Sequence, residues 1–302
     1  MNTTQVILVS GSNSGFGRLT IETLARQGHT VFAGIRNSAG KNAAAAHAIR
    51  TLAPTVAGAL HIVDLDVTDD ASVTQAVQTV IDTAGRLDVV VNNAGVGAFS
   101  PIEALTHDQV QQLFDANLFG VLRMNRAALP QMRAQASGLL IQIGSVVGRM
   151  AYPFTGIYAA SKFALEGLTE AYRLELGALG IEAAIVEPGL YPTNIFAGGI
   201  VPTDSARVVP YQAFMNHTVA GVQAAMSGEF GPVPDPQEVA DVIAQLIATP
   251  AGTRPLRTVV GMEGQREGPL LLNTASEQVF AATQQAAGWE PFVTLKRGDN
   301  GG

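Results

Sequence analysis

The sequence predicts an α/β fold built on a doubly wound, mostly parallel sheet of about seven strands, with helices on both faces. Short runs rich in Val and Ile alternate with longer stretches of helical composition, which is typical of βαβ units. The short runs are apolar almost throughout, as expected of strands covered on both faces. With 302 residues, 47% of them hydrophobic and 14% charged, the chain is long enough to bury a sizeable core.

The same alternation places each element in order. Strands are expected at Gln5–Ser10, Thr30–Ile35, Ala59–Leu65, Leu87–Val91, Gly138–Gly144, Ile181–Glu187 and Leu256–Val260. Helices are expected at Gly15–Gln27, Gly40–Leu52, Asp70–Ala84, His107–Ala136, Gly156–Ala178 and Pro236–Thr249. Suitable N-caps and helix stops support these bounds: Asp69 or Asp70 and Asp235 for the starts, and Gly85, Gly138 and Gly180 for the ends.

Two segments depart from the alternation. Residues 189–236 mix Pro, Gly and aromatic residues, and a long irregular insertion of this kind is usually a functional lid or a surface loop. Residues 262–302 form a C-terminal tail with one helical pattern, Thr274–Ala287. No linker or repeat divides the chain, so we expect residues 1–302 to form a single domain.

Charge and composition exclude several classes of function. The formal net charge of -7, with 18 Lys and Arg and no basic cluster, argues against nucleic acid or an anionic membrane as the main partner. Without cysteine there is no disulfide framework, thiolate metal site or cysteine nucleophile. The amino terminus has no signal-peptide pattern, and no apolar run reaches the length of a membrane span. These features predict a cytoplasmic protein.

A glycine-rich turn, "GSNSGFG" from Gly11 to Gly17, lies between the first expected strand and helix. Gly11 allows a tight exit from the strand, Gly15 begins the helix, and Gly17 lets the helix pack closely. The exposed N–H groups at the helix start would attract a pyrophosphate. The spacing differs from the commonest dinucleotide fingerprint, G-x-G-x-x-G, and a glycine-rich turn can also be purely structural.

The residue at the end of the second strand indicates which dinucleotide would bind. An acidic residue there would bond a ribose 2'-hydroxyl, whereas an arginine accommodates a 2'-phosphate. The sequence is "VFAGIRN", with Arg36 at this place and no acid beside it. NADP is therefore favoured over NAD, although a solvated surface arginine is the alternative.

A third cluster, "GSVVGRMAYPFTGIYAASK", contains candidate catalytic residues. Tyr158 and Lys162 are four residues apart, so they share one helix face. A neighbouring ammonium favours the phenolate and thereby lowers a tyrosine pKa from its usual value near 10, which suits acid/base catalysis. Ser145 follows the preceding strand, at the edge of the sheet where ligands bind. Tyr-x-x-x-Lys alone also occurs on ordinary surface helices.

Six motifs in order make the chain resemble a short-chain dehydrogenase/reductase of the single-domain Tyr-x-x-x-Lys type, over about Val6 to Gly261. They are "GSNSGFG", "LDVTD" at Leu65–Asp69, "NNAG" at Asn92–Gly95, "NLFG" at Asn117–Gly120, Ser145 with Tyr158 and Lys162, and "EPG" at Glu187–Gly189. The resemblance implies a Rossmann-like dinucleotide-binding and catalytic domain, with residues 189–236 as a substrate lid. It also implies a homodimer or a homotetramer.

The resemblance implies a role for each motif. The catalytic tetrad would be Asn117, Ser145, Tyr158 and Lys162. Tyr158 would be the acid/base, and Ser145 would position the carbonyl. Lys162 would bind the nicotinamide ribose and tune the tyrosine, and Asn117 would hold a water. Cofactor-binding residues would be Gly11, Ser14, Gly15, Phe16, Gly17, Arg36, Asp66, Val67, Asn93, Ala94, Gly95, Tyr158, Lys162, Pro188, Gly189 and Thr193. The turn begins with Ser10 instead of the usual threonine, and no basic residue precedes Gly15, so Arg36 alone carries the NADP preference.

Residues expected to flank the site are mostly apolar or aromatic: Val96, Ala98, Phe99, 150–154, Leu190, Tyr191, Ile195 and Phe196. Such a pocket suits a lipophilic or aromatic ketone or alcohol better than a phosphorylated sugar or a carboxylate, although these side chains could instead pack the lid onto the domain. The five histidines lack ligand spacing, so we expect no metal site.

The sequence thus predicts an NADPH-dependent carbonyl reductase. The alternatives are an NAD-dependent alcohol dehydrogenase of the hydroxysteroid kind and a non-catalytic nucleotide-sensing protein that kept the fold. An intact tetrad argues against the last.

Overall fold

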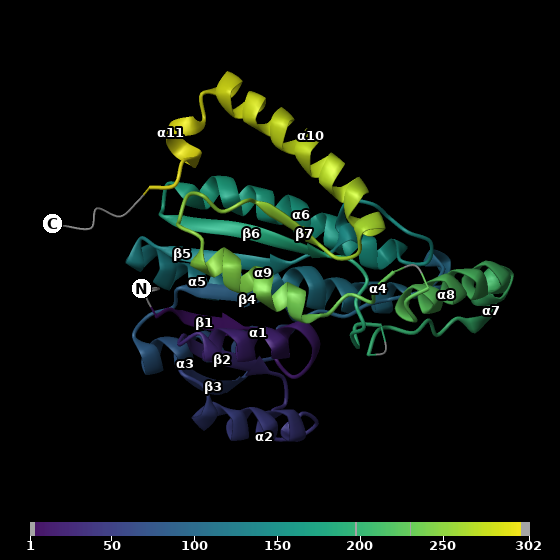
Figure 1. Cartoon of the computed structure of the whole chain (residues 1–302), viewed down its shortest axis with the longest axis horizontal. Coiled ribbons are helices and arrows are strands. Elements are labelled where there is room, and N and C mark those ends of the chain that lie inside the picture. Colours follow the sequence, from purple (N-terminus) through teal and green to yellow (C-terminus); the bar gives the residue numbers. More distant parts are fainter. Residues whose placement is uncertain (1–3, 197, 230, 297–302) are drawn as a thin grey trace.

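The sheet of the computed structural model has seven strands, all parallel, in the order β3-β2-β1-β4-β5-β6-β7 (Figure 1). The structure describes residues 4–196, 198–229 and 231–296. The strands are β1 (Val6–Val9), β2 (Thr30–Ile35), β3 (Ala59–Asp64), β4 (Val89–Asn92), β5 (Gly138–Ile143), β6 (Ile181–Pro188) and β7 (Arg257–Val260). Each expected strand is present, with its ends within two residues of the expected position.

The strand order reverses between β1 and β4, because the chain crosses from β3 at one edge of the sheet to β4 on the other side of β1. These two strands pair from Ile7 with Val89 to Val9 with Val91. Where the strand order reverses in this way, the loops after the two strands diverge and leave a crevice at their carboxyl ends. The glycine-rich turn and the "NNAG" segment follow β1 and β4 and therefore face each other at this crevice.

Helices cover both faces of the sheet and enclose two apolar cores. One core lies under α1 (Gly15–Arg26), α2 (Ala43–Leu52) and α9 (Gln237–Ala248) and includes Ile21, Ile49 and Ile243. The other lies under α3 (Asp70–Ala84), α5 (Gly120–Gln135) and α6 (Gly156–Gly177) and includes Val77, Met124 and Leu176. Burial on both faces explains why the strands are apolar without alternation.

Several helix ends follow from local chemistry. The Asp69 carboxylate accepts the Ser72 N–H at 2.7 Å, as expected of an N-cap, and Gly85 ends α3 in the left-handed conformation. At α9, Asp235 accepts the Gln237 N–H at 2.9 Å. Gly138 is not a helix stop: α5 ends at Gln135, its C-cap Ala136 adopts the left-handed conformation, and Gly138 begins β5.

The expected helix His107–Ala136 is not continuous. It consists of α4 (His107–Phe114), a wider π-helical segment at Asp115–Phe119, and α5. In the π segment the Gly120 N–H bonds to the Asp115 carbonyl, five residues back, which interrupts the regular ladder and is common at functional sites. The interruption lies at the "NLFG" motif. Short 3₁₀ turns occur at Ala53–Thr55, Ile102–Ala104, Val146–Gly148 and Val209–Tyr211.

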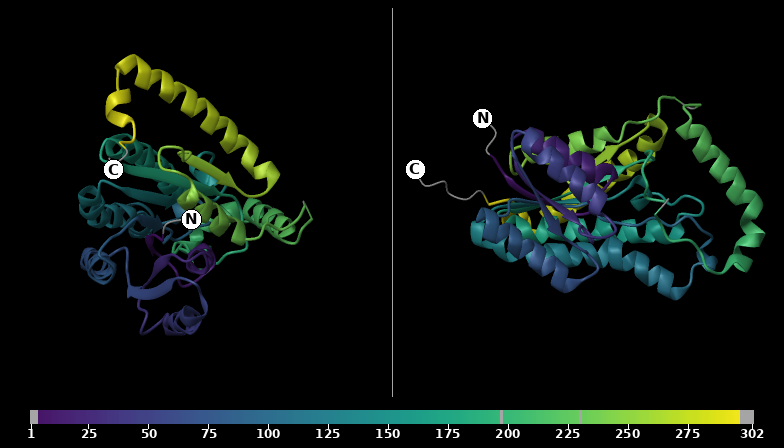
Figure 2. Two further views of the ribbon diagram at one scale, coloured as in Figure 1. Left: turned by 60° about the vertical axis from the view of Figure 1, so that its left-hand side comes forward. Right: turned by 90° about the horizontal axis from the view of Figure 1, so that it is seen from below.

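Residues 189–236 are less irregular than expected. They contain α7 (Ser205–Val208) and the longer α8 (Gln212–Met226), which projects from the body beyond the carboxyl ends of the strands (Figure 2). None of the residues in α8 is buried. The sequence signal was weak because α8 has no apolar stripe to bury.

The tail also differs from expectation, since its helix begins eleven residues earlier than Thr274. It forms α10 (Glu263–Ala287) and α11 (Glu290–Val293), and α10 runs diagonally from the end of β7 to α11 (Figure 1). The chain then returns to the end of α6, where the Lys296 N–H donates to the Gly177 carbonyl at 3.0 Å. Residues 297–302 lie outside the described part. Within that part, no helix is long and apolar enough to cross a membrane.

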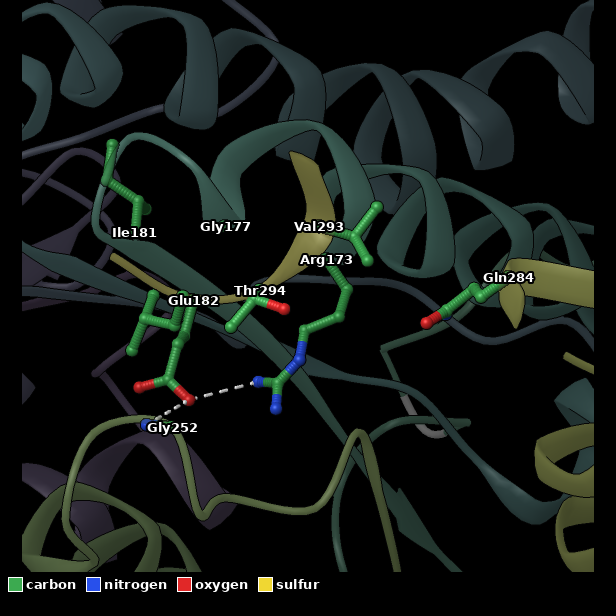
Figure 3. Close-up of a pocket in the computed structure, with 9 residues that line it drawn as sticks. Arg173, Gly177, Ile181, Glu182, Gly252, Gln284, Val293 and Thr294 are labelled. Carbon is green, nitrogen blue, oxygen red and sulfur yellow. Dashed lines mark hydrogen bonds and ion pairs between the residues drawn. The ribbon is translucent and has the colours of Figure 1, made fainter. Parts of the chain in front are cut away.

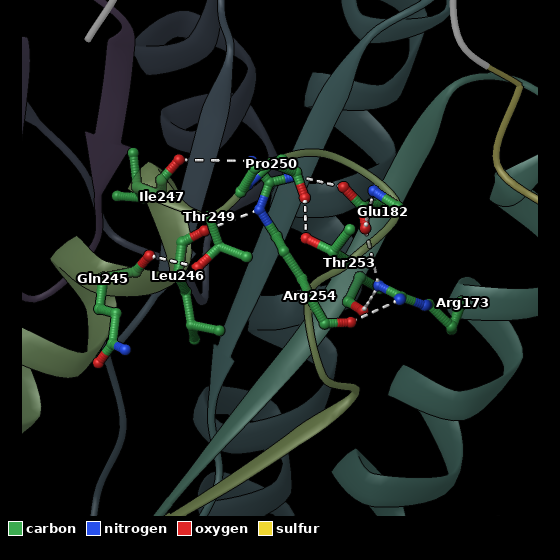
Figure 4. A network of polar contacts seen from close by, with 11 residues as sticks. Arg173, Glu182, Gln245, Leu246, Ile247, Thr249, Pro250, Thr253 and Arg254 are labelled. Atoms are coloured by element: carbon green, nitrogen blue, oxygen red, sulfur yellow. Dashed lines mark hydrogen bonds and ion pairs between the residues drawn. The ribbon is translucent and has the colours of Figure 1, made fainter.

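A buried ion network lies at the amino-terminal end of β6 (Figures 3 and 4). Glu182 is paired with Arg254 and, at 3.2 Å, with Arg173, and it accepts the Gly252 N–H at 3.0 Å. Arg254 also donates to the Leu246 carbonyl at 2.7 Å, at the end of α9. A cavity of about 240 Å³ adjoins the network beneath α11. The network lies at the amino-terminal ends of the strands, whereas the glycine-rich turn lies at their carboxyl ends. Its role is therefore structural.

We therefore expect Glu182→Gln to lower the free energy of unfolding by about 3–5 kcal/mol, because it leaves buried arginines without their carboxylate. Urea unfolding measures this change. Arg26→Gln, which removes an exposed partner of Glu22, is the matched control and should cost less than about 1 kcal/mol. Equal effects of the two substitutions would contradict a structural role for the buried network.

Candidate active site

Three of the four expected catalytic residues converge at the carboxyl end of β5. Ser145 follows that strand and begins a short 3₁₀ turn, and Tyr158 and Lys162 lie in the first two turns of α6. All three side chains are buried. The Ser145 hydroxyl donates to the Pro188 carbonyl at 3.2 Å and accepts the Val147 N–H at 3.3 Å, so both the strand end and the turn fix its position.

Tyr158 is surrounded by low-dielectric neighbours. Burial raises the pKa of its phenol to about 12, and the neighbouring Ser145 hydroxyl, which favours the phenolate, opposes part of that rise. The sequence suggested that the ammonium of Lys162 would lower this pKa. Instead, burial dominates, and the phenol keeps its proton at neutral pH.

The buried ammonium of Lys162 contacts a backbone carbonyl and lies near the Tyr158 ring. Its Nζ donates to the Ile143 carbonyl at 2.7 Å and lies 5.7 Å from the centre of the Tyr158 ring. Burial lowers the pKa of Lys162 to about 8, and the nearby Glu166 carboxylate opposes this fall. The ammonium therefore titrates near physiological pH.

Asn117 occupies the π-helical segment and contacts both sides of the site. Its side chain bonds the Val96 backbone twice, accepting from the N–H at 2.8 Å and donating to the carbonyl at 2.9 Å. It also donates to the Ser161 hydroxyl at 3.1 Å. The amide is therefore engaged with protein, and its expected part in holding a water stays a prediction. Ser161, between Tyr158 and Lys162 in the sequence, was not singled out by its motif.

The glycine-rich turn leaves a cradle that side chains would fill. Gly11 and Gly15 have φ of +68° and +55°, in the left-handed region. A Cβ on Gly11 would lie 2.9 Å from Ala94 Cα, and one on Gly17 would overlap the Gly11 carbonyl and the Asn93 amide. The start of α1 has no side-chain cap and no acidic residue in its first turn, so its N–H groups fit a phosphate.

Hydrogen bonds join this turn to the "NNAG" segment. Asn93 donates its amide to the Ser10 and Gly11 carbonyls at 2.9 and 3.1 Å. The Ser10 hydroxyl accepts the N–H groups of Asn93 and Ala94 at 3.1 and 3.0 Å. Serine thus suffices where threonine is usual, because the bonds need only the hydroxyl.

Arg36 and Asp66 lie together beyond the cradle, after β2 and β3. Their closest charged atoms, Arg36 Nη1 and Asp66 Oδ2, are 3.9 Å apart, and Arg36 is 60% exposed. Asp66 also accepts bonds from the Thr68 N–H and hydroxyl at 3.0 and 2.7 Å. Val67, next in sequence, is buried against Gly120. A basic and an acidic group are therefore both available where a ribose would bind.

The segment after β6 closes the other side of the cradle. Gly189 donates to the Val260 carbonyl at 2.7 Å, and Phe16 packs edge-on against Tyr191 with ring centres 5.4 Å apart. A Cβ on Gly15 would lie 3.9 Å from Thr193, so Thr193 faces the start of α1. Gln265 of the tail, a residue that the sequence did not point to, accepts the Leu190 N–H at 2.8 Å.

A family model described as short chain dehydrogenase matches residues 5–199. The chain belongs to the short-chain dehydrogenase family. The members of this family are oxidoreductases that use nicotinamide cofactors. The family and the fold class expected from the sequence are therefore confirmed.

Three relatives illustrate the match. This short-chain dehydrogenase is 39% identical over 190 residues to 3-ketodihydrosphingosine reductase of Bacteroides thetaiotaomicron, covering 63% of this chain and 65% of that one, slightly less than two thirds of its length. It is 34% identical over 257 residues to 17-beta-hydroxysteroid dehydrogenase type 1 of Homo sapiens, covering 82% and 75%. A short-chain dehydrogenase from Streptomyces avermitilis superposes with a TM-score of 0.70 at 28% identity, over 95% and 99% of the two chains.

The donor set fits a nicotinamide dinucleotide and shows no metal site. The cradle of glycines, the uncapped start of α1 and the Arg36–Asp66 pair match the pyrophosphate and ribose of such a cofactor. Within the described residues, no group of three or more His, Asp or Glu side chains is placed to hold a metal ion.

We expect Gly17→Ala to weaken binding of the dinucleotide and to lower the free energy of unfolding by about 1–3 kcal/mol, because the new methyl group overlaps buried backbone. Calorimetric titration with NADPH and urea unfolding measure the two effects. Gly167→Ala is the control, since its Cβ meets nothing within 4 Å and alanine favours a helix. If Gly17→Ala bound NADPH as the native chain does, the cradle would not be the pyrophosphate site.

Proposed function

We propose that this short-chain dehydrogenase reduces a lipophilic or aromatic ketone to a secondary alcohol with NADPH. The observation that carries the proposal is the convergence of Ser145, Tyr158 and Lys162 beside a glycine cradle at the carboxyl edge of the sheet. When bound, NADPH supplies the hydride that is added to the carbonyl carbon.

The proton must come from the protein. Because burial raises the pKa of Tyr158 to about 12, its phenol is protonated at neutral pH and can donate to the carbonyl oxygen as the C–H bond forms. Ser145, held at Pro188 and Val147, has a hydroxyl with which to position that oxygen. Lys162 lies beneath the tyrosine ring as a cation that favours the phenolate left behind.

An aromatic ring against Tyr158 and a second cluster of aromatic rings support an apolar substrate. Phe196 packs edge-on against Tyr158, with ring centres 5.7 Å apart. Phe154, which has a φ of +65°, contacts Phe99 and Phe214 at ring-centre distances of 5.6 and 5.0 Å. These rings come from three separate loops and from α8, so residues 189–236 act as the substrate lid in this proposal.

The names of two relatives support this substrate class and leave the direction open. One name denotes a reductase of a keto compound, and the other a dehydrogenase of a hydroxysteroid. An NAD-dependent alcohol oxidation is accordingly the second candidate. Arg36, which follows β2, favours NADP over this alternative, because an arginine there accommodates a 2'-phosphate.

Other sequence expectations remain part of the proposal. A homodimer or homotetramer is supported by Phe119 and Phe163, large apolar residues that are nearly half exposed on neighbouring helical segments. A cytoplasmic location and a small-molecule substrate, with no nucleic-acid or membrane partner, also stay predictions.

We expect Tyr158→Phe to reduce turnover of ketones by at least about 100-fold, the usual loss on removing a general acid, and to leave NADPH binding nearly intact. NADPH oxidation in a screen of lipophilic ketones and calorimetric titration measure the two. Tyr172→Phe, on the same helix but outside the site, is the control. Undiminished turnover in Tyr158→Phe would exclude this mechanism, and NADPH binding with no turnover of any ketone or alcohol by the native chain would favour a nucleotide sensor.

We expect Arg36→Asp to shift the ratio of NADPH to NADH affinity toward NADH by about tenfold or more, because it replaces a charge-assisted phosphate contact with repulsion. Parallel titrations with both dinucleotides give the ratio. Arg50→Asp makes the same charge change at an exposed position on α2 and should leave the ratio alone. An unchanged ratio in Arg36→Asp would remove this residue from cofactor selection.

A further inference from the structure

Behind Lys162, on the side away from Tyr158, two acidic side chains are buried without exposure to water. Glu166 follows one turn later on α6, and Glu187 lies on β6 next to Pro188. They are 3% and 0% exposed. Isolated carboxylates at such positions would be very costly, so the surroundings must either pair or neutralise them.

One guanidinium, that of Arg257, forms ion pairs with both members of this pair. Arg257 of β7 places Nε 2.8 Å from Glu166 Oε2 and 3.6 Å from Glu187 Oε1. Its Nη2 is 2.6 Å from a third carboxylate, Glu170. On the far side, Asn273 of α10 donates to Glu187 Oε2 at 2.6 Å. Three carboxylates therefore share the guanidinium of Arg257.

One carboxylate oxygen of each glutamate receives no hydrogen bond from the described part of the chain. Glu166 Oε1 and Glu187 Oε1 are both buried, and neither has a hydrogen-bond donor among the described residues. Two ionised carboxylates cannot bond one another, whereas a single proton between them supplies the missing donor and removes one buried charge.

We propose that Glu166 and Glu187 share one proton, held on Glu187, and that the charge remaining on Glu166 is a positioning group that keeps Lys162 in its ammonium form. Glu187 donates its O–H to Glu166, as a carboxylic acid does to a carboxylate. Glu166 is the partner that stays ionised because Arg257 and Lys162 both face it.

The electrostatics of the surrounding elements agree with this assignment. Burial and the neighbouring Glu166 raise the pKa of Glu187 to about 8, so Glu187 is protonated at neutral pH. Burial also raises the pKa of Glu166, but Arg257 and Arg149 oppose that rise. The titratable and charged groups around Glu166 are Lys162 and Glu170 on α6, Arg149 after the 3₁₀ turn, Glu187 on β6 and Arg257 on β7.

Two measurements test the shared proton and do not require an assay of enzyme activity. Infrared spectra at neutral pH should contain the C=O stretch of a protonated carboxyl that disappears in Glu187→Gln and persists in the control Glu170→Gln. If Glu187→Gln does not fold, Glu166→Gln replaces it, since an amide at 166 can itself donate to Glu187 and the proton is no longer needed. A C=O band that persists in Glu187→Gln, or in Glu166→Gln where that variant replaces it, would overturn the proposal.

The pH dependence of stability provides the second measurement. Because the pKa of Glu187 is raised in the folded chain, the stabilisation from its proton is complete below its ordinary pKa, near 4, and is lost as pH rises toward about 8. Glu187→Gln lacks this loss. The melting temperature of Glu187→Gln minus that of the native chain should therefore rise by on the order of 5 °C as the pH is raised from about 5 to about 8. A constant difference would overturn the proposal.

The role of Glu166 toward Lys162 rests on the proposed function and is tested by kinetics. Glu166→Gln removes the negative charge beside Lys162, so the alkaline limb of the pH–rate profile should move to lower pH, and Glu166→Asp should restore it in part. A purely structural role would lower the rate without moving the limb. If the native chain reduces no ketone, the proposed function fails, while the infrared and melting results still decide on the shared proton.

Discussion

The burial of the Lys162 ammonium is the constraint on which the candidate site depends. A charged amine inside a domain is tolerated only where polar groups meet it, and its one close acceptor among the described residues is the Ile143 carbonyl at the end of β5. That contact joins α6 to the end of β5. On the same face of the helix, Tyr158, one turn earlier, lies beside Ser145, and Glu166, one turn later, is buried.

Strand β6 contains buried acidic residues whose charges are balanced differently at its two ends. It has a buried glutamate near each end. Glu182 pairs with Arg254 and Arg173, whereas Glu187 accepts a bond from Asn273 and has a second oxygen, Oε1, without a donor among the described residues. At the amino end the partners outnumber the acid, so the charge is balanced by cations. At the carboxyl end three carboxylates share Arg257, and the proposed proton removes one of their charges. The same strand thus has an ion-pair network at its amino end and a pair of titratable carboxyl groups at its carboxyl end.

Sequence patterns located the strands well because a strand buried on both faces is an uninterrupted apolar run between glycines and polar residues. They failed where tertiary contacts override local preference. Gly264, Gly268 and Pro269 disfavour a helix, yet α10 begins at Glu263 because Gln265 and Asn273 are bonded to the segment around Glu187. The π segment around Asn117 carries no periodic signal. The motifs identified the candidate catalytic residues, but the raised pKa of Tyr158 comes from burial, which spacing alone does not reveal.

Access to Tyr158 depends on how the segment after β6 is docked. Gly97 donates to the Ile195 carbonyl at 3.1 Å and accepts the Ile200 N–H at 2.8 Å, and a Cβ on Gly97 would lie 2.8 Å from the Phe196 ring. The backbones meet closely because Gly97 has no side chain, and this contact holds Phe196 over the phenol. A substrate that reaches Tyr158 must therefore either pack against Phe196 or displace it. Under the proposed function, both routes favour a substrate with an apolar surface next to its carbonyl, because a charged group would be desolvated against the aromatic ring of Phe196.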